Sequence, residues 1–316
     1  MIYFKIKKFN NILVNSCLIS LYFISYLNPL NAYPIYAQQA YENPREATGR
    51  IVCANCHLAQ KSVNIEAPHS VLPNSIFTVS IKIPIDHEKK QILSNGKQGD
   101  LNVGAVLILP NEFKLAPKDK LNKELKEKTK DLYFNQYNQQ SENIIVIGPI
   151  AGKQHEEIIF PIISPDPSIN KKVNFVKYPI YVGGNRGRGQ LYPSGEKSNN
   201  NALIASESGQ IIKIETLNEG GYNLIIKTKN DQIKNQIIPN GLSLKVNENQ
   251  IVNFGEVLTN DPNVGGFGQN ETEIVLQNPK RVIGFLIFSA FIFLSQIFFV
   301  FKKKQFEKVQ AKQMLF

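Results

Sequence analysis

Short runs of alternating apolar and polar residues, separated by proline, glycine and asparagine, fill much of the chain after residue 62. A period of two places every second side chain on one face, so each run predicts a strand with one buried face. The clearest early runs are Phe77–Ile83, Ala105–Leu109 and Asn143–Ile147. Because turn residues separate them at regular intervals, the sequence predicts a mainly β protein with an antiparallel sandwich.

The alternation stops at Ser198–Asn201 and then resumes. Glu219–Gly221 is a hairpin signal between two of the later runs. The strands expected here are Gln210–Ile214, Tyr222–Ile226, Leu242–Val246 and Glu256–Leu258. They predict a second, smaller β domain, after which Asp261–Gly268 leads back to the first domain and Glu271–Leu276 enters a membrane stalk.

Two segments have the character of helices. Pro117–Lys130 is amphipathic and rich in charge, which predicts a solvated surface helix without an assigned function. Glu46–Leu58 has few helix breakers, and we expect it to form a helix that carries the cysteine motif described below.

Both ends of the chain carry long apolar runs. Residues 1–32 hold three lysines, an apolar run from Ile12 to Leu30, and then Asn31 and Ala32. This pattern predicts an export signal cleaved after Ala32, with an uncleaved signal anchor as the alternative. Val282–Phe301 is free of charge. At 1.5 Å per residue it spans about 30 Å, the thickness of a bilayer core, so it predicts one transmembrane helix.

The net charge of +10 is concentrated at the two ends, since residues 1–32 carry +3 and residues 281–316 carry +5. The remaining charge of +2 gives no reason to expect a nucleic-acid partner. Lys302–Lys304 directly follow the apolar run. By the positive-inside rule, the tail 302–316 stays on the side of synthesis and the large middle region is exported.

Cys53, Cys56 and His57 form the pattern C-x-x-C-H, the attachment signature of c-type haem. Three other interpretations compete with this one. A thioredoxin-like redox pair would need a βαβ context, and a structural zinc site would need four ligands, yet no second paired motif exists. A plain disulfide would leave His57 unexplained. Cys17 lies in the predicted signal, so the exported chain would keep only the motif cysteines.

The glycine-rich run Gly183–Gln190 lacks the ending of a phosphate-binding P-loop. We expect it to form a tight turn whose backbone passes close to a flat group such as a porphyrin.

An iron ligated by His57 has a second axial position. Methionine is excluded on the exported side, because Met1 and Met314 are the only two. The remaining candidates are His69, His87, His155, a lysine and the α-amino group of Tyr33. An α-amine has a pKa of about 8, so its neutral form can bind iron at little cost.

Five long and distinctive segments stand out: Tyr33–Gln39, Tyr41–Ala59, Asn102–Pro110, Asp261–Gln269 and Lys302–Gln310. They resemble the cytochrome f family. The resemblance implies an elongated, mainly β lumenal region. In it a large haem-carrying domain, residues 33–200 with a return segment at 265–280, is interrupted by a small β domain at 201–264. It also implies a single-pass protein of the thylakoid membrane, in a plastid or a cyanobacterium, with a stromal or cytoplasmic C-terminus.

The same resemblance implies the site. The iron of one covalent haem c would be bound by His57 and by the α-amino group of Tyr33. Pro34, Tyr36, Pro149 and Pro193 would pack near the haem, and Gln91, Asn185, Gln190, Asn200 and Asn263 would line an internal water chain. Phenylalanine or tryptophan is commoner in the family at Tyr36, whose phenol keeps the apolar contact and adds a hydroxyl that needs a partner.

In plant relatives a lysine patch binds the soluble carrier. Lys90 and Lys97 match this patch and Lys89 lies beside them, whereas Gln98 and Thr216–Glu219 depart from it. A solvated turn is the simpler interpretation of these lysines. The departure disfavours a plant-like complex with acidic plastocyanin and favours a cytochrome of the c6 type or weaker electrostatic steering.

The resemblance therefore implies electron transfer and no catalysis by side chains. The chain would be a subunit of the cytochrome b6f complex, beside cytochrome b6, that passes single electrons from the Rieske protein to plastocyanin or cytochrome c6. Two other functions stay open. One is a haem enzyme or gas sensor with an open distal site, and the other is an anchored β domain whose motif is incidental.

Overall fold

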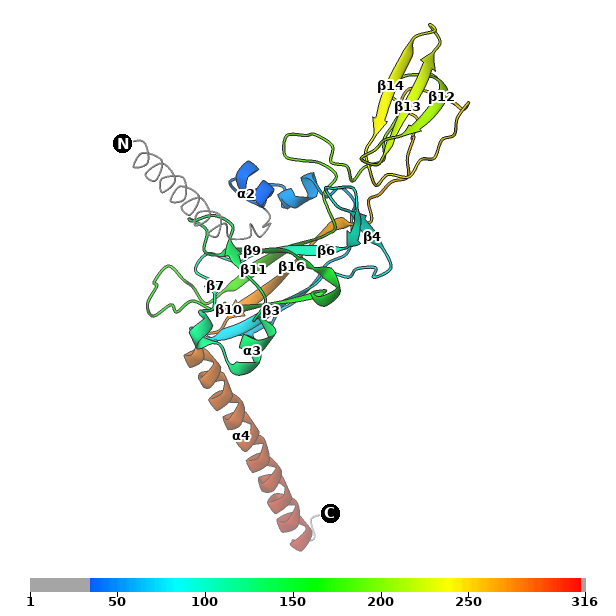
Figure 1. Cartoon of the computed structure of the whole chain (residues 1–316). Helices are drawn as coiled ribbons and strands as arrows, with labels where there is room; N and C mark the ends of the chain where they lie inside the picture. Colours follow the sequence, from blue (N-terminus) through cyan, green and yellow to red (C-terminus); the bar gives the residue numbers. More distant parts are fainter. Residues whose placement is uncertain (1–34, 314–316) are drawn as a thin grey trace, which may run out of the picture. The chain divides into compact units, whose positions relative to one another are not determined.

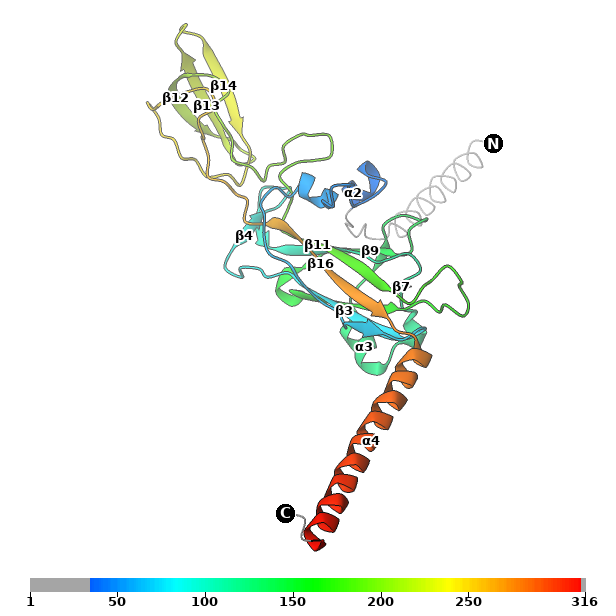
Figure 2. The same ribbon diagram turned by 180° about the vertical axis from the view of Figure 1, so that it is seen from behind.

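The computed structural model describes residues 35–313, most of which belong to β-strands or to the loops between them (Figures 1 and 2). The predicted signal, with Tyr33 and Pro34, lies outside the described residues. In chain order the elements are α2 (Ile35–Ala40), the 3-10 helix η1 (Val52–Asn55), β1 (Asn64–Glu66), β2 (Ser70–Val71), β3 (Ile76–Lys82), β4 (Lys90–Ile92), β5 (Gln98–Asp100), β6 (Asn102–Ile108), β7 (Lys114–Leu115), η2 (Lys118–Lys120), α3 (Lys123–Lys128), β8 (Asn135–Gln136), β9 (Ile144–Ala151), η3 (Gly152–Gln154), β10 (Glu157–Ile163), β11 (Lys177–Arg186), β12 (Gly209–Thr216), β13 (Tyr222–Thr228), β14 (Ile233–Ile238), β15 (Ile251–Val252), β16 (Gly266–Leu276) and α4 (Pro279–Lys312).

Two sheets pack face to face around the main core (Figure 1). One has six strands in the order β2-β16-β11-β6-β9-β8, and the other has four in the order β1-β3-β10-β7. Their pairs are antiparallel except that of β2 with β16. Ile81 and Phe160 from one sheet meet Leu107, Ile145 and Ile180 from the other. The predicted sandwich is therefore confirmed.

The alternation of apolar residues explains why some strands could be found from sequence. In β3, Phe77, Val79 and Ile81 face the core while the residues between them are partly exposed. The central strand β6 is instead buried on both faces. Its second face contributes to a separate apolar cluster with Ile51 and Phe267, which lies beside the cysteine motif.

A third sheet, in the order β14-β13-β12-β15, has a core of its own (Figure 1). Ile211, Leu224 and Ile226 are fully buried in it. The N–H of Leu217 donates to the carbonyl of Gly221 over 3.1 Å and closes the predicted hairpin. The limits of a small domain at 201–264 stay a prediction.

Two strands expected in this region are wrong. Within 242–246 only Leu244 forms a bridge, with Thr259, and within 256–258 only Val257 does, with Ile204. Leu242, Val246 and Leu258 of these runs are buried in the small core, so their pattern reports burial and not strand pairing. The strand β14 escaped prediction for the opposite reason, because Ile233 and Ile237 are 66% and 65% exposed.

The helix expected at Glu46–Leu58 is also wrong. The motif lies on η1, and just before it Arg45 and Ile51 form an isolated bridge. Gly49 turns the chain between them with a φ of +88°, a left-handed conformation that ends a helix. The helix of this region is α2, ahead of the motif.

Pro117–Lys130 is helical only in part. Leu121 and Asn122 separate η2 from α3. The side chain of Asn122 caps α3 by accepting a hydrogen bond from the N–H of Leu125 over 2.8 Å. At this break Leu121 has an extended backbone and a buried side chain.

The first half of the glycine-rich run is strand, and only its second half, Gly187–Gln190, leaves the sheet. Gly183 and Gly184 belong to β11, and a positive φ begins only at Gly187. A Cβ on Gly183 would come within 2.8 Å of the ring of Phe267, so this ring occupies the space that a side chain would need.

Glu271–Leu276 is likewise not a stalk, because β16 pairs with β11 as far as Val275. The side chain of Asn278 then caps α4. Within residues 35–313, α4 is the one helix long and apolar enough to cross a membrane, which confirms the predicted span. The described part of the predicted tail, up to Lys312, continues this helix.

Candidate functional site

The motif cysteines lie within one tight turn. The backbone N–H groups of Cys56 and His57 both donate to the carbonyl of Cys53, over 3.2 and 3.0 Å. Both thiols are free, so no disulfide forms between them. Burial raises the pKa of Cys53 to about 12 and also raises that of Cys56. Within residues 35–313, no three or more His, Cys, Asp or Glu side chains gather where they could hold a metal ion, which disfavours a zinc site.

His57 carries a neutral imidazole. Its Nε2 accepts a hydrogen bond from Nδ2 of Asn185 over 3.1 Å, and burial lowers its pKa to about 4. Its Nδ1 is buried and has no hydrogen-bond partner within residues 35–313. A neutral ring with a lone pair on Nε2 is the form that binds a metal, so the donor set fits a c-type haem.

Residues remote in sequence hold the turn in place. Gln269 of β16 accepts a hydrogen bond from the N–H of Ile51 over 2.9 Å and donates to the carbonyl of Gly49 over 3.0 Å. Asn55 donates to the hydroxyl of Tyr41 over 3.1 Å. No residue pattern marks these positions as part of the site, although Gln269 ends one of the segments that resemble the cytochrome f family.

The helix α2 is anchored next to the motif. The hydroxyl of Tyr137 lies 2.7 Å from the carbonyl of Ala37 and 2.8 Å from that of Tyr41. Gln38 donates to the carbonyl of Tyr137 over 2.8 Å. Ala37 and Cys53 pack against the same apolar cluster. The segment directly after Tyr33 is therefore held beside the cysteines.

An open groove of about 450 Å³ lies between α2 and the segment that follows Leu191, lined by Tyr36, Gln39, Ala40, Tyr192, Pro193, Ser194 and Glu196. The rings of Tyr36 and Tyr192 meet edge to face with centroids 5.7 Å apart. The N–H groups of Gln190 and Leu191 donate to the carbonyl of Cys56, so the lining segment starts beside the motif. Two predicted haem-packing residues, Tyr36 and Pro193, thus share one groove of ordinary ligand-pocket size.

Pro149 is exposed in β9. Gly148 and Gly104 make the close contacts that lead from it to Asn185, the residue that contacts His57. A Cβ on Gly148 would come within 2.6 Å of the Cα of Gly104, and one on Gly104 within 2.7 Å of Oδ1 of Asn185. Pro149 and Asn185 therefore flank the same close contact between β6 and β9. Pro34 lies outside the described residues.

The predicted water-lining residues fall into a buried group and an outlying one. Gln91, Gln190 and Asn200 are at most 3% exposed. Gln190 and Asn200 both donate to the carbonyl of Arg188, over 3.1 and 2.8 Å. Oε1 of Gln91 and Oδ1 of Asn200 are buried acceptors without a partner in residues 35–313. Asn263, in contrast, accepts only a local hydrogen bond.

The other candidate axial ligands make contacts elsewhere. His87 pairs with Glu156 over 2.5 Å, and Nδ1 of His155 lies 2.9 Å from the carbonyl of Ala151. The ring of His69 is exposed. Within the described chain, no hydrogen bond joins any of these three to the motif.

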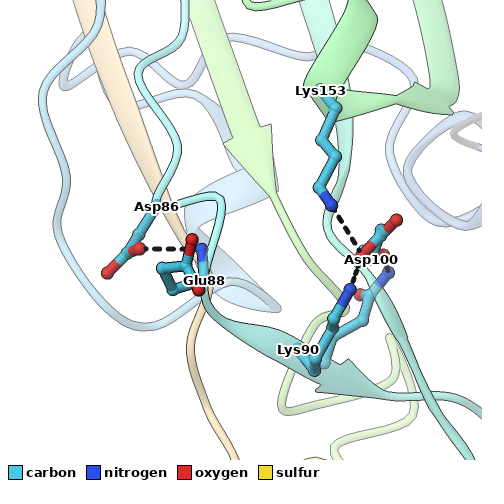
Figure 3. A network of polar contacts seen from close by, with 6 residues as sticks. Asp86, Glu88, Lys90, Asp100 and Lys153 are labelled. Atoms are coloured by element: carbon cyan, nitrogen blue, oxygen red, sulfur yellow. Dashed lines mark hydrogen bonds and ion pairs between the residues drawn. The ribbon is translucent and has the colours of Figure 1, made fainter.

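Of the predicted docking lysines, Lys90 begins β4 (Figure 3), Lys89 directly precedes it, and Lys97 directly precedes β5. Lys90 forms a hydrogen-bonded ion pair with Asp100, and Nζ of Lys153 lies 3.4 Å from the same carboxylate. The hydrogen bond from Lys90 holds the pKa of Asp100 below its ordinary value.

Lys89 pairs with Asp86 over 3.5 Å, whereas Lys97 is exposed. Asp86 also accepts a hydrogen bond from the backbone of Glu88 (Figure 3). The hairpin therefore presents acids and bases in nearly equal number, and its lysines do not form a basic patch.

Both halves of the chain match the same family of known proteins. The family model described as Apocytochrome F, N-terminal matches residues 33–187, and Apocytochrome F, C-terminal matches residues 199–316. The chain is 62% identical to cytochrome f of Cyanidium caldarium over 295 residues, covering 93% of this chain and 91% of the relative. It is 62% identical to that of Porphyra purpurea over 289 residues (92% and 90%) and 56% identical to that of Pinus koraiensis over 301 residues (95% and 94%).

Proposed function

The chain belongs to the cytochrome f family of c-type cytochromes in the cytochrome b6f complex, and on this premise we propose that it transfers single electrons between two protein partners. The electrons would come from the Rieske iron–sulfur protein and go to a soluble lumenal carrier, plastocyanin or cytochrome c6. The chain would act as one subunit of a larger oxidoreductase that includes cytochrome b6.

The observation that carries the proposal is the turn of Cys53, Cys56 and His57. It offers two free thiols for thioether bonds and, beside them, a buried neutral imidazole for the iron. Haem c would supply a reversible one-electron couple. The chain's own residues would hold the group on the Cys56 side and cover it with the apolar side chains of Tyr36 and Pro193.

The second axial ligand in this proposal is the α-amino group of Tyr33. Tyr33 precedes Ala37 by four residues, which span at most about 14 Å when extended. Ala37 shares an apolar cluster with Cys53, so the amine has the reach that ligation needs. The N-terminal family match begins at residue 33, where cleavage after Ala32 would free this amine.

An internal water chain is part of the proposal. Gln91, Asn185, Gln190 and Asn200 would line it, with Asn263 at one end. The support lies in Oε1 of Gln91 and Oδ1 of Asn200, because buried acceptors without a protein partner are the groups that ordered water satisfies. Asn185 would connect this chain to His57.

The membrane arrangement follows from α4. We propose that it anchors the protein in a thylakoid membrane, with residues 33–280 in the lumen and the tail on the stromal or cytoplasmic side. Lys302–Lys304 at the end of the apolar run support this orientation. The nearly neutral hairpin at Lys90 supports a carrier that needs little electrostatic steering, such as a cytochrome of the c6 type.

Covalent attachment and axial ligation can be tested separately on the purified full-length protein. The haem should stay with the polypeptide in a denaturing gel, and the double variant Cys53→Ser, Cys56→Ser should lose it. The reduced protein should not bind carbon monoxide, because nitrogen ligands hold both axial positions. Ready binding would favour a haem enzyme or gas sensor with an open distal site, and absence of covalent haem would favour an incidental motif.

A further inference from the structure

Arg186, the last residue of β11, is a buried cation without an anionic partner. It is 3% exposed, and its Nη2 donates to the carbonyl of Ser62 over 2.6 Å. Its Nε and Nη1 are buried and have no hydrogen-bond partner within residues 35–313. None of the ion pairs formed by those residues includes it. Residues 1–34 and 314–316 contain no aspartate or glutamate that could supply a partner.

An unpaired buried charge weakens a fold. Burial lowers the pKa of the Arg186 guanidinium, yet arginine keeps its proton at neutral pH. A neutral side chain of similar length would fill the same space without the desolvation penalty. Stability therefore does not account for an arginine at this position. Its charge is instead expected to act on a group nearby.

The nearest candidate is the motif. Asn185 precedes Arg186 and contacts Nε2 of His57 over 3.1 Å. Adjacent residues of a strand point to opposite faces, so the guanidinium lies on the far side of the sheet from His57. The largest possible separation is the sum of the Asn185–His57 contact, one Cα–Cα step and the extended lengths of the Asn185 and Arg186 side chains. The guanidinium therefore lies no more than roughly 18 Å from the imidazole. The intervening residues are part of a buried sheet, where dissolved salt screens charges much less than at the surface.

We propose that Arg186 raises the reduction potential of the iron held at His57. The inference rests on the proposed haem site. When one electron arrives from a one-electron donor, such as a reduced iron–sulfur centre, the positive charge on the iron falls by one unit. Arg186 keeps its proton in both states and no bond is made or broken. Its repulsion of the iron is weaker in the reduced state, so the buried charge favours reduction.

The size of the effect follows from Coulomb's law. Two unit charges about 15 Å apart, at an effective dielectric constant of about 20, change an equilibrium roughly sixfold to sevenfold. For a one-electron couple this is about 48 mV.

The test is a spectroelectrochemical redox titration of holoprotein variants. Arg186→Gln removes the charge and should lower the midpoint potential by about 48 mV, whereas Arg186→Lys keeps the charge at low pH and should stay close to the wild type there. The matched control is Arg50→Gln. Arg50 is exposed and its guanidinium lies 3.1 Å from the carbonyl of Ala54 inside the motif, so solvent screens its charge.

Ionic strength distinguishes the effects of the two arginines on the midpoint potential. The shift caused by Arg50→Gln should shrink as ionic strength rises, whereas that of Arg186→Gln should not. An unchanged potential in a folded Arg186→Gln protein with covalent haem would overturn the inference and leave the proposed function intact. Failure of the wild-type chain to hold covalent haem would count against the proposed function instead.

If Arg186→Gln does not fold, Arg186→Lys decides alone. A buried lysine loses its proton at a lower pH than arginine does. The potential of Arg186→Lys should therefore fall away from that of the wild type as pH rises. Parallel pH profiles for the two proteins would rule the charge out.

Discussion

Asn185 joins the six-stranded sheet to His57, and a single glycine makes room for it. Its partner across the β6–β11 pair is Gly104, where a Cβ would lie 2.7 Å from Oδ1 of Asn185 and 3.2 Å from the carbonyl of Ile147. The carbonyl of Ile147 and the hydrogen-bonded amide of Asn185 cannot move aside as the tip of a flexible side chain can. The position of the Asn185 amide at His57 therefore depends on the absence of a Cβ at Gly104.

Gly104→Ala should displace Asn185 and lower the free energy of unfolding by about 1–3 kcal/mol, because the added methyl overpacks a closed contact. Denaturant unfolding of the purified protein measures this, and its visible spectrum reports the change at His57. Gly99→Ala is the control, since its Cβ would meet only the flexible side chain of Leu93. Equal stability of the two variants would contradict the packing described here.

At this scale the sequence predicts what is local. Cys53, Cys56 and His57 are recognisable because the haem chemistry needs them within five residues. Tyr137, Gln269 and Arg186 act through contacts with residues about one hundred or more positions away, and no local pattern carries that information.

The β4–β5 hairpin shows how an element changes the meaning of its residues. In sequence Lys89, Lys90 and Lys97 suggest a basic patch. The hairpin register sets Lys90 opposite Asp100, and Lys153 reaches the same carboxylate (Figure 3). The pKa of Asp100 lies below its ordinary value, so the pair persists at neutral pH and is lost only as pH falls through that lowered pKa.

Asp100→Asn should release two lysines at once and raise the positive charge of the hairpin by one unit. Electron transfer to an acidic soluble carrier should then become a few-fold faster at low salt, with little change at high salt. Stopped-flow kinetics over a range of ionic strength measures both. Asp231→Asn makes the same charge change in the loop between β13 and β14, where Asp231 pairs with Lys227, and should have no effect. A rate change independent of salt would exclude steering.

The elements divide in the same way into those that sequence reveals and those that it does not. β3 was predictable because one of its faces is buried and the other wet. The helix expected across the motif fails because Gly49 takes a left-handed conformation that closes a bridge between Arg45 and Ile51. Ile51 of this bridge is also held by Gln269 of β16, a tertiary contact that overrides helix propensity.

At the scale of the whole chain, the two terminal helices of residues 35–313 have different roles: α4 serves the membrane and α2 serves the cysteine motif. α4 supplies an apolar span for a membrane. α2 begins two residues after Tyr33 and is fixed beside Cys53 by Tyr137. The residues alone leave three histidines, a lysine and an amine as possible axial ligands, and only resemblance to a family selects the amine. It would come into being when residues 1–32 are removed, so the iron site would be finished by proteolysis.

The central claim, two-nitrogen ligation by His57 and the amine of Tyr33, is tested most directly by the absorption spectrum of mature protein whose first residue has been identified by mass spectrometry. Wild-type protein should begin at Tyr33 and show a low-spin spectrum in both oxidation states. A change at Ala32 that leaves one extra residue before Tyr33 should keep the covalent haem and alter the spectrum. An unaltered spectrum in that extended protein would contradict the account.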